Sequence, residues 1–237
     1  MKHLLLYGLQ RSGTSYVQTL LPANFDIKLE IDTYTYSLPI HKHFRPYAKP
    51  WFFPHLNLLH NFSYASFSEF DAHCQRLTHI EDLKYIVVAK EPYSWYLSFY
   101  RFANRESIFY RMKKKYIHHM YVLDYSQYFK KWLEFRDACP EKVMIVNYES
   151  FLEDFEGAMD EMKDKLGLTK TQDTYQNFSK VGMSKKFTKE KKDMYLKGES
   201  YKTFRDEELL VLSENLDEEV VNRLGYQVYY PRGIQGK

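Results

Sequence analysis

The sequence predicts an α/β fold, namely a P-loop-like three-layer sandwich with a central parallel sheet flanked by helices. Apolar runs at 4–7, 85–89 and 143–146 are typical of strands buried on both faces of a sheet. Each run is followed by a short polar loop and then by apolar residues at helical spacing. Strands that alternate with helices in this way run parallel and carry helices on both faces of the sheet.

The loop after the first run reads GLQRSGTS and precedes a helical stripe at 16–21. Gly8 and Gly13 are spaced as in the phosphate-binding pattern G-x-x-x-x-G-K-[ST], and Ser15 fills its last position. Such a loop turns backbone N–H groups inward at a helix N-terminus, where they hold phosphate oxygens. The lysine of the pattern is replaced by Thr14, and the cation stands three residues earlier, at Arg11. We therefore expect phosphate binding without the lysine that reaches a triphosphate.

The next segments are less regular. Residues 25–32 alternate between apolar and polar side chains, which indicates a strand. Residues 33–54 are rich in aromatic residues and proline, which indicates a long irregular segment of the kind that is usually functional. Ser66 and Glu69 form a capping box, which predicts a helix that continues to about residue 77.

The second half repeats the alternation of strands and helices. Apolar spacing predicts helices from residue 95 to about 102, around 125–133 and over 152–166. The lysine-rich stretch 169–199 contains few aliphatic residues and is expected to be a loop or a lid. A final helix is expected over 206–224, because one face carries leucine and valine at helical spacing.

Composition limits the function. The length of 237 residues suits one domain over 1–237, and the net charge of +3 is too small to predict a nucleic-acid partner. Cys74 and Cys139 lie far apart and show no metal-binding spacing, so a reduced, cytoplasmic protein without a metal is expected. No stretch approaches the ~20 apolar residues of a membrane span, which argues against a membrane partner.

Three motifs, in order along the chain, resemble the sulfotransferase family that uses 3′-phosphoadenosine-5′-phosphosulfate (PAPS). GLQRSGTS resembles the 5′-phosphosulfate loop, in which Arg or Lys precedes S-G-T. VAKEPYSWYLS resembles the 3′-phosphate motif, whose cation and serine would be Lys90 and Ser98. VNYESFL resembles the strand-to-helix segment Y-E-x-L. The resemblance is weakest over 33–84 and 169–201, where acceptor-binding segments are expected.

The resemblance implies a sulfotransferase that moves a sulfuryl group from PAPS to a hydroxyl or amine, leaves the product PAP and needs no metal. The acceptor would be a small molecule or a glycan, and the high aromatic content of 18% suits sugar rings or phenols. Resemblance to compact carbohydrate sulfotransferases implies a glycan hydroxyl. Lys90 would bind as a point charge, because the family more often has Arg there. Lys197 corresponds to a cationic loop over the 3′-phosphate in some relatives. The implied co-substrate-binding residues are Arg11, Ser12, Gly13, Thr14, Ser15, Lys90, Ser98 and Lys197.

The general base is sought in the segment HKHFRP, because many relatives have lysine and histidine before a proline. His43 is the first candidate, with Lys42 as a helper near the bridging oxygen and His41 as the second candidate. Glu30 and Asp32 come third, because many carbohydrate sulfotransferases use a carboxylate. Arg11, with its loop, would stabilise the charge that develops on the leaving phosphate.

Two other functions stay open at this point. A catalytically inactive protein on the same fold could bind a nucleotide or a glycan. A P-loop kinase is the third hypothesis, but it would need a lysine after Gly13 and acidic magnesium ligands after the strands. The predicted strands end instead at Lys90 and at Tyr148-Glu149.

Overall fold

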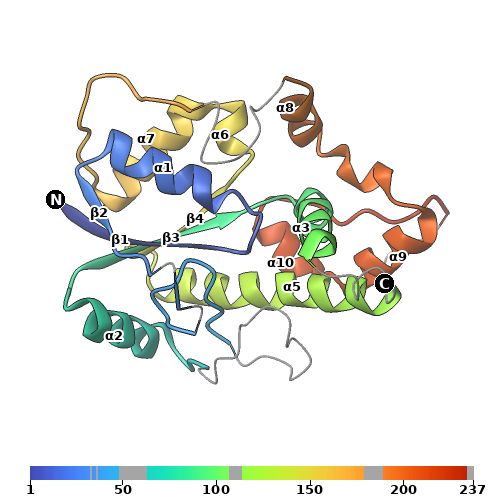
Figure 1. Ribbon diagram of the computed structural model, residues 1–237, viewed down its shortest axis with the longest axis horizontal. Helices are drawn as coiled ribbons and strands as arrows, with labels where there is room; N and C mark the ends of the chain where they lie inside the picture. Colours follow the sequence, from blue (N-terminus) through green and yellow to red (C-terminus); the bar gives the residue numbers. More distant parts are fainter. Residues whose placement is uncertain (33, 36, 48–62, 107–113, 179–188, 234–237) are drawn as a thin grey trace.

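The computed structural model describes the whole chain except residues 33, 36, 48–62, 107–113, 179–188 and 234–237 (Figure 1). Its sheet has four parallel strands in the order β2-β1-β3-β4. The strands are β1 (Lys2–Gly8), β2 (Ile27–Leu29), β3 (Leu83–Ala89) and β4 (Val143–Asn147). The central pair β1 and β3 places Gly8 opposite Val88, so the loops that follow both strands leave the same edge of the sheet.

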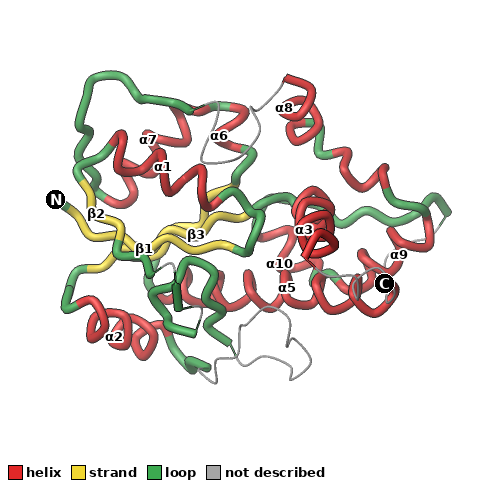
Figure 2. The backbone as a smooth tube through the Cα atoms, in the orientation of Figure 1, coloured by secondary structure: helices red, strands yellow, loops and turns green. Residues whose placement is uncertain are grey.

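Alternate side chains of the strands face two separate cores, which makes three layers. Leu4 and Leu6 pack on one face, and Leu5 and Tyr7 pack on the other. The first face is covered by α1 (Thr14–Asn24), α6 (Ser150–Glu153) and α7 (Phe155–Leu166). The second is covered by α2 (Phe67–Thr78), α3 (Pro92–Glu106), α5 (Lys114–Ala138), α9 (Asp206–Asn215) and α10 (Glu218–Arg223) (Figure 2). The predicted three-layer α/β sandwich is confirmed.

The core under α5 is unusually aromatic. Trp132 is fully buried and contacts Tyr7 of β1, with ring centroids 4.7 Å apart. Phe70 of α2 meets the same indole edge to face at 5.5 Å. Such pairs add to the stabilisation that burial alone gives. Much of the high aromatic content therefore holds α2 and α5 against the sheet.

Three local predictions were wrong. Strand β2 covers only Ile27–Leu29, and Asp32 forms an isolated bridge with His41 instead of continuing the strand. The helix expected over 206–224 is divided, because the Asp217 side chain accepts a hydrogen bond from Val220 N and starts α10 anew. The third concerns the stretch expected to be a loop or a lid.

That stretch, 169–199, contains ordered structure where it is described. Residues 170–178 pack along α1, where Asn24 accepts a hydrogen bond from Gln176 N and Thr171 N donates to Asn24 O. Helix α8 (Lys189–Leu196) follows, and then a 3₁₀ helix, η2 (Glu199–Thr203). Residues 179–188 of the expected lid, and 48–54 of the irregular segment, lie outside the described residues.

Candidate active site

The loop between β1 and α1 needs glycine at both glycine positions of the phosphate-binding pattern, Gly8 and Gly13. A Cβ atom at Gly8 would lie 2.5 Å from Ser12 Oγ and 3.0 Å from the carbonyl oxygen of Val88. Gly13 has φ of 101°, and a Cβ there would lie 2.3 Å from the ring of Tyr148. Arg11 also adopts a positive φ, of 73°. The loop is thus folded tightly against β3 and against the residue that follows β4.

This loop presents unused hydrogen-bond donors. Gly13 O accepts the first helical bonds of α1, from Tyr16 N and Val17 N. Over the described part of the chain, the N–H groups of Gly13, Thr14 and Ser15 donate to no protein acceptor. The Ser12 hydroxyl is buried, with 1% of the side chain exposed, and it has no partner there either. Donors left open at a helix N-terminus suit an anion, as the sequence predicts.

Lys90 follows β3 directly and is buried, with 3% of its surface exposed. Its ammonium lies 5.3 Å from the ring centroid of Tyr148 and 4.1 Å from that of Tyr195 on α8. Among the described residues, it has no hydrogen bond and no carboxylate within 4.0 Å. The faces of the two rings stabilise this cation. Its charge also acts on Glu149, where it opposes the rise in pKa that burial causes. Lys90 thus places a cation beside the phosphate loop, which suits an anionic ligand.

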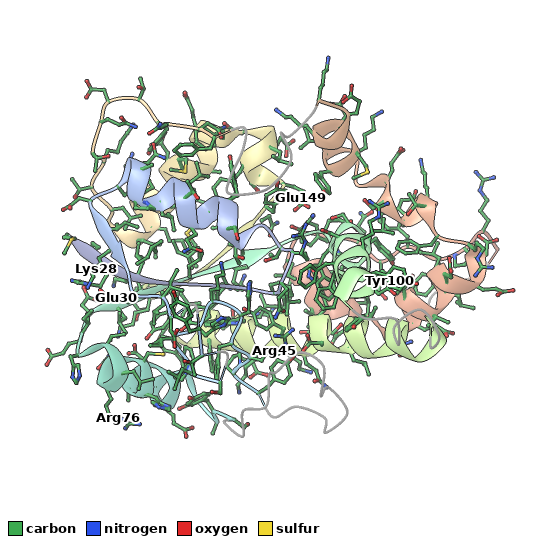
Figure 3. All side chains as sticks on the ribbon, in the orientation of Figure 1. Lys28, Glu30, Arg45, Arg76, Tyr100 and Glu149 are labelled. Carbon is green, nitrogen blue, oxygen red and sulfur yellow. The ribbon has the colours of Figure 1, made fainter. Side chains whose placement is uncertain are left out.

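Two carboxyl groups lie near Lys90, the buried Glu91 and the half-buried Glu149. Glu91 accepts hydrogen bonds from Tyr93 N and Ser94 N and so caps the start of α3. Glu149 accepts from Glu91 N and from the Tyr226 hydroxyl (Figure 3). Burial raises the pKa of Glu91 to about 7 and also raises the pKa of Glu149. Glu149 thus braces the loop after β3 rather than capping its own helix.

The raised pKa of Glu91 predicts a pH dependence of stability. Because the carboxyl has a pKa of about 7 when folded and 4.5 ordinarily, the folded state binds more protons between these values. The free energy of unfolding should then fall as pH rises from 4.5 to 7, by about 3 kcal/mol from this group. Glu91→Gln should remove that fall, as urea unfolding of both proteins across this range would reveal. Parallel pH curves for the two proteins would contradict the assignment.

Residues 41–43, which we call the HKH segment, form hydrogen bonds with both the N–H and the carbonyl of Gly8. Gly8 N donates to Lys42 O at 3.0 Å, and His43 Nδ1 lies 2.7 Å from Gly8 O. A carbonyl can only accept, so Nδ1 of His43 carries the proton and Nε2 keeps its lone pair. Among the described residues, Nε2 has no hydrogen-bond partner. His43 therefore offers an unprotonated nitrogen beside the phosphate loop.

His41 has the opposite tautomer. Its Nδ1 accepts a hydrogen bond from His43 N at 3.0 Å, so the proton of its neutral ring sits on Nε2. Burial lowers the pKa of His43 to about 3 and that of His41 to about 4. Both rings are neutral near pH 7, but only His43 has a free basic nitrogen. Lys42, whose pKa burial also lowers, donates to Gln18 Oε1 on α1 at 3.0 Å.

The predicted site residues do not all lie together in the structure. Arg11 is exposed, and its guanidinium lies 5.6 Å from the ring centroid of Phe102 on α3. Ser98 is half-buried on α3, and Lys197 is exposed just after α8. Glu30 is bonded to His3 and Lys28, and Figure 3 places it well away from Glu149.

Asp32, the other carboxylate candidate, is held in a turn. Its Oδ1 accepts from Tyr34 N and Thr35 N, and these bonds lower its pKa. Tyr195 carries no signal in the sequence, because it belongs to the stretch expected to be a loop or a lid. Only the position of α8 brings its ring to Lys90.

In the described ranges, no three His, Cys, Asp or Glu side chains gather closely enough to hold a metal ion. No helix in those ranges is both long and apolar enough to cross a membrane.

The chain is similar to known sulfotransferases in sequence and in structure. A family model described as "Sulfotransferase domain" matches residues 1–223. Among solved structures, the chain matches the crystal structure of mouse sulfotransferase SULT7A1 complexed with PAP. That match has 13% sequence identity and a TM-score of 0.48, and it covers 94% of this chain and 88% of the other. No curated protein matches the chain significantly.

Proposed function

We propose that this chain, which belongs to the sulfotransferase family, sulfates a carbohydrate hydroxyl with His43 as the base. As a member of that family, it is a PAPS-dependent transferase whose product is PAP. The observation that carries the assignment of the site is the cation of Lys90, which lies between the rings of Tyr148 and Tyr195 beside an open phosphate loop. The loop and Lys90 follow neighbouring strands. A nucleotide with phosphates at both its 5′ and 3′ positions would place one phosphate at the loop and the other at Lys90.

The residues present fit that nucleotide. The N–H groups of Thr14 and Ser15 and the unpartnered hydroxyl of Ser12 supply donors for the 5′-phosphosulfate. Lys90 supplies the charge for the 3′-phosphate, and Ser98 and Lys197 are assigned to the same phosphate by the family motif. PAPS itself supplies the activated sulfuryl group.

The chain's own residues would then do three things. Arg11 and the N–H groups of the loop stabilise the charge that develops on the departing phosphate. Lys42, held against α1 by Gln18, places a second cation beside the loop. His43 accepts the acceptor's proton at Nε2, the nitrogen that its bond to Gly8 leaves free. His43 is neutral at pH 7 and is therefore already in its basic form.

The test is transfer of ³⁵S from labelled PAPS to a panel of mono- and oligosaccharides, with simple phenols and amines beside them. Transfer to a saccharide supports the proposal. Transfer only to phenols or amines would replace the acceptor class and keep the reaction. A protein that PAP stabilises against heat but that transfers label to nothing would be an inactive binding protein. Stabilisation by ATP and not by PAP would point to a kinase.

Arg11 should act mainly on the chemical step. Arg11→Ala is expected to lower kcat by ~10²–10³, the usual effect of losing one donor to a developing negative charge. PAP affinity should fall less, because the N–H groups of the loop remain. Steady-state kinetics with labelled PAPS would measure both, and Arg76→Ala on the exposed side of α2 is the control. A higher KM for PAPS at unchanged kcat would show that Arg11 only binds the substrate.

A further inference from the structure

A buried ion pair lies behind the HKH segment. Arg45 is 1% exposed and Asp124 of α5 is 4% exposed. Arg45 Nε lies 2.7 Å from Asp124 Oδ1, and Nη2 lies 2.6 Å from Oδ2, which is the forked geometry of a strong charged pair. The Tyr47 hydroxyl also donates to this carboxylate. Figure 3 labels Arg45 beside α5.

The same guanidinium reaches the active site on two sides. Its Nη1 donates to His43 O at 3.0 Å, and its Nη2 donates to Gln10 Oε1 at 3.2 Å. Gln10 belongs to the phosphate loop, and its carbonyl accepts from Trp95 Nε1 on α3 at 2.9 Å. One side chain therefore joins α5, the HKH segment and the phosphate loop.

The cost of burying this pair needs an explanation. Two desolvated charges are often no better for stability than well-packed apolar residues of similar volume. The residues from His41 to Arg45 lie outside the sheet and the helices, and their backbone bonds are those of an isolated bridge at His41, of turns to Leu38 and Phe44, and of Lys42 to Gly8. A base must be placed to within a fraction of an ångström to be effective. Gly8 holds the ring of His43, and Arg45 holds its backbone carbonyl, so the two contacts together fix the residue.

We propose that Arg45, anchored by Asp124, is a positioning residue that fixes His43 against the phosphate loop for proton transfer. The proposal rests on the proposed function, because it takes His43 as the base. Arg45 touches neither reacting group and acts through the carbonyl of His43 and the side chain of Gln10.

The first test removes both charges together, because either single variant would leave an unpaired buried charge and could unfold the protein. Arg45→Met with Asp124→Leu is expected to keep the fold and to leave PAP affinity within about twofold. It should lower kcat by about 10²-fold with little change in the KM for PAPS, the scale expected for a misplaced catalytic group. The ¹⁵N NMR spectrum of His43 should change from one Nδ1–H tautomer to a mixture.

Two further variants complete the design. Gln10→Met cuts the link to the phosphate loop without exposing a buried charge, and it should lower kcat by about tenfold. The control is Lys142→Met with Asp71→Asn, which removes a partly buried ion pair at the amino end of β4. The asparagine keeps an acceptor for the Tyr85 hydroxyl. This control should keep the kcat and the His43 tautomer of the wild type.

The outcomes separate the two proposals. If the wild type transfers no label from PAPS, the proposed function fails. If it does transfer label, and the folded double variant at Arg45 and Asp124 keeps the wild-type kcat and a single tautomer, the positioning role is overturned. If the double variant does not fold, the test rests on Gln10→Met. An unchanged kcat in Gln10→Met would then overturn the positioning role of Arg45. An equal loss of kcat in the Lys142 control would reduce the effect to general destabilisation and would also overturn it.

Discussion

His43→Gln is expected to lower kcat for sulfuryl transfer by about 10²–10⁴-fold, the usual contribution of a positioned general base. PAP affinity should stay within about twofold, because the phosphate loop and Lys90 do not depend on the imidazole. The reason lies in the tautomer, since the bond to Gly8 leaves Nε2 of His43 free to accept a proton. Labelled transfer would give kcat, and calorimetry would give the PAP affinity.

His41→Gln is the matched control. The His41 ring uses Nδ1 to accept from His43 N, a bond that a glutamine oxygen can replace. Its kcat should fall less than tenfold. Loss of turnover in His41→Gln with activity in His43→Gln would reverse the assignment. Activity in both variants together with an inactive Glu30→Gln would make the base a carboxylate.

The pH profile should also differ from that of an exposed histidine. Burial, Lys42, His41 and Arg45 all lower the pKa of His43, to about 3. Since His43 loses its proton as pH rises through that value, it is already basic at pH 5. The kcat/KM of the free enzyme should therefore show no rise near pH 6.5, where a free histidine titrates. An acid limb near pH 6.5 that disappears in His43→Gln would contradict the burial of this ring.

Lys90→Met is expected to weaken PAP binding by about 10- to 100-fold, the effect of losing a charge-assisted contact worth ~1.5–3 kcal/mol. Binding of 5′-AMP should barely change, because it has no 3′-phosphate. Without ligand, the variant should lose only the contacts of the ammonium with the rings of Tyr148 and Tyr195. Calorimetry with both nucleotides measures the difference.

Lys84→Met provides the control for Lys90, because Lys84 lies on β3, the strand that Lys90 follows. Lys84 lies near the amino end of β3 and pairs with the exposed Asp82, so its loss should leave both affinities unchanged. Equal weakening of PAP and 5′-AMP by Lys90→Met would place the 3′-phosphate elsewhere. Ser98 and Lys197 would then be the residues to test.

Sequence patterns predicted the parts of the molecule that depend on local spacing. Buried strands appear as apolar runs, and the spacing of Gly8 and Gly13 predicts a loop that only glycine can form. The break at Asp217 was missed because the apolar stripe continues across it, while a single side-chain cap starts a new helix. Local spacing could not have shown this competition.

Contacts between distant segments could not be predicted in the same way. Arg45 and Asp124 are 79 positions apart, and each reads as an ordinary polar residue in its own segment. The choice between His41 and His43 likewise depended on hydrogen bonds to Gly8 and to the backbone, which spacing does not encode. The position of Tyr195 over Lys90 depends on α8, which follows a stretch without a clear apolar pattern.

The pairing of β1 with β3 has a consequence for which ligands the protein can accept. Gly8 stands opposite Val88, and Lys90 comes two residues after Val88. The phosphate loop and the segment of Lys90 therefore start from adjacent strands, whose spacing is ~4.8 Å. In the proposed arrangement, the pairing of the two strands sets how far apart the two phosphates of one nucleotide are held. Inserting one residue at the end of β3 should turn the Lys90 side chain to the opposite face and should weaken the binding of a nucleotide with two phosphates, while the phosphate loop stays intact.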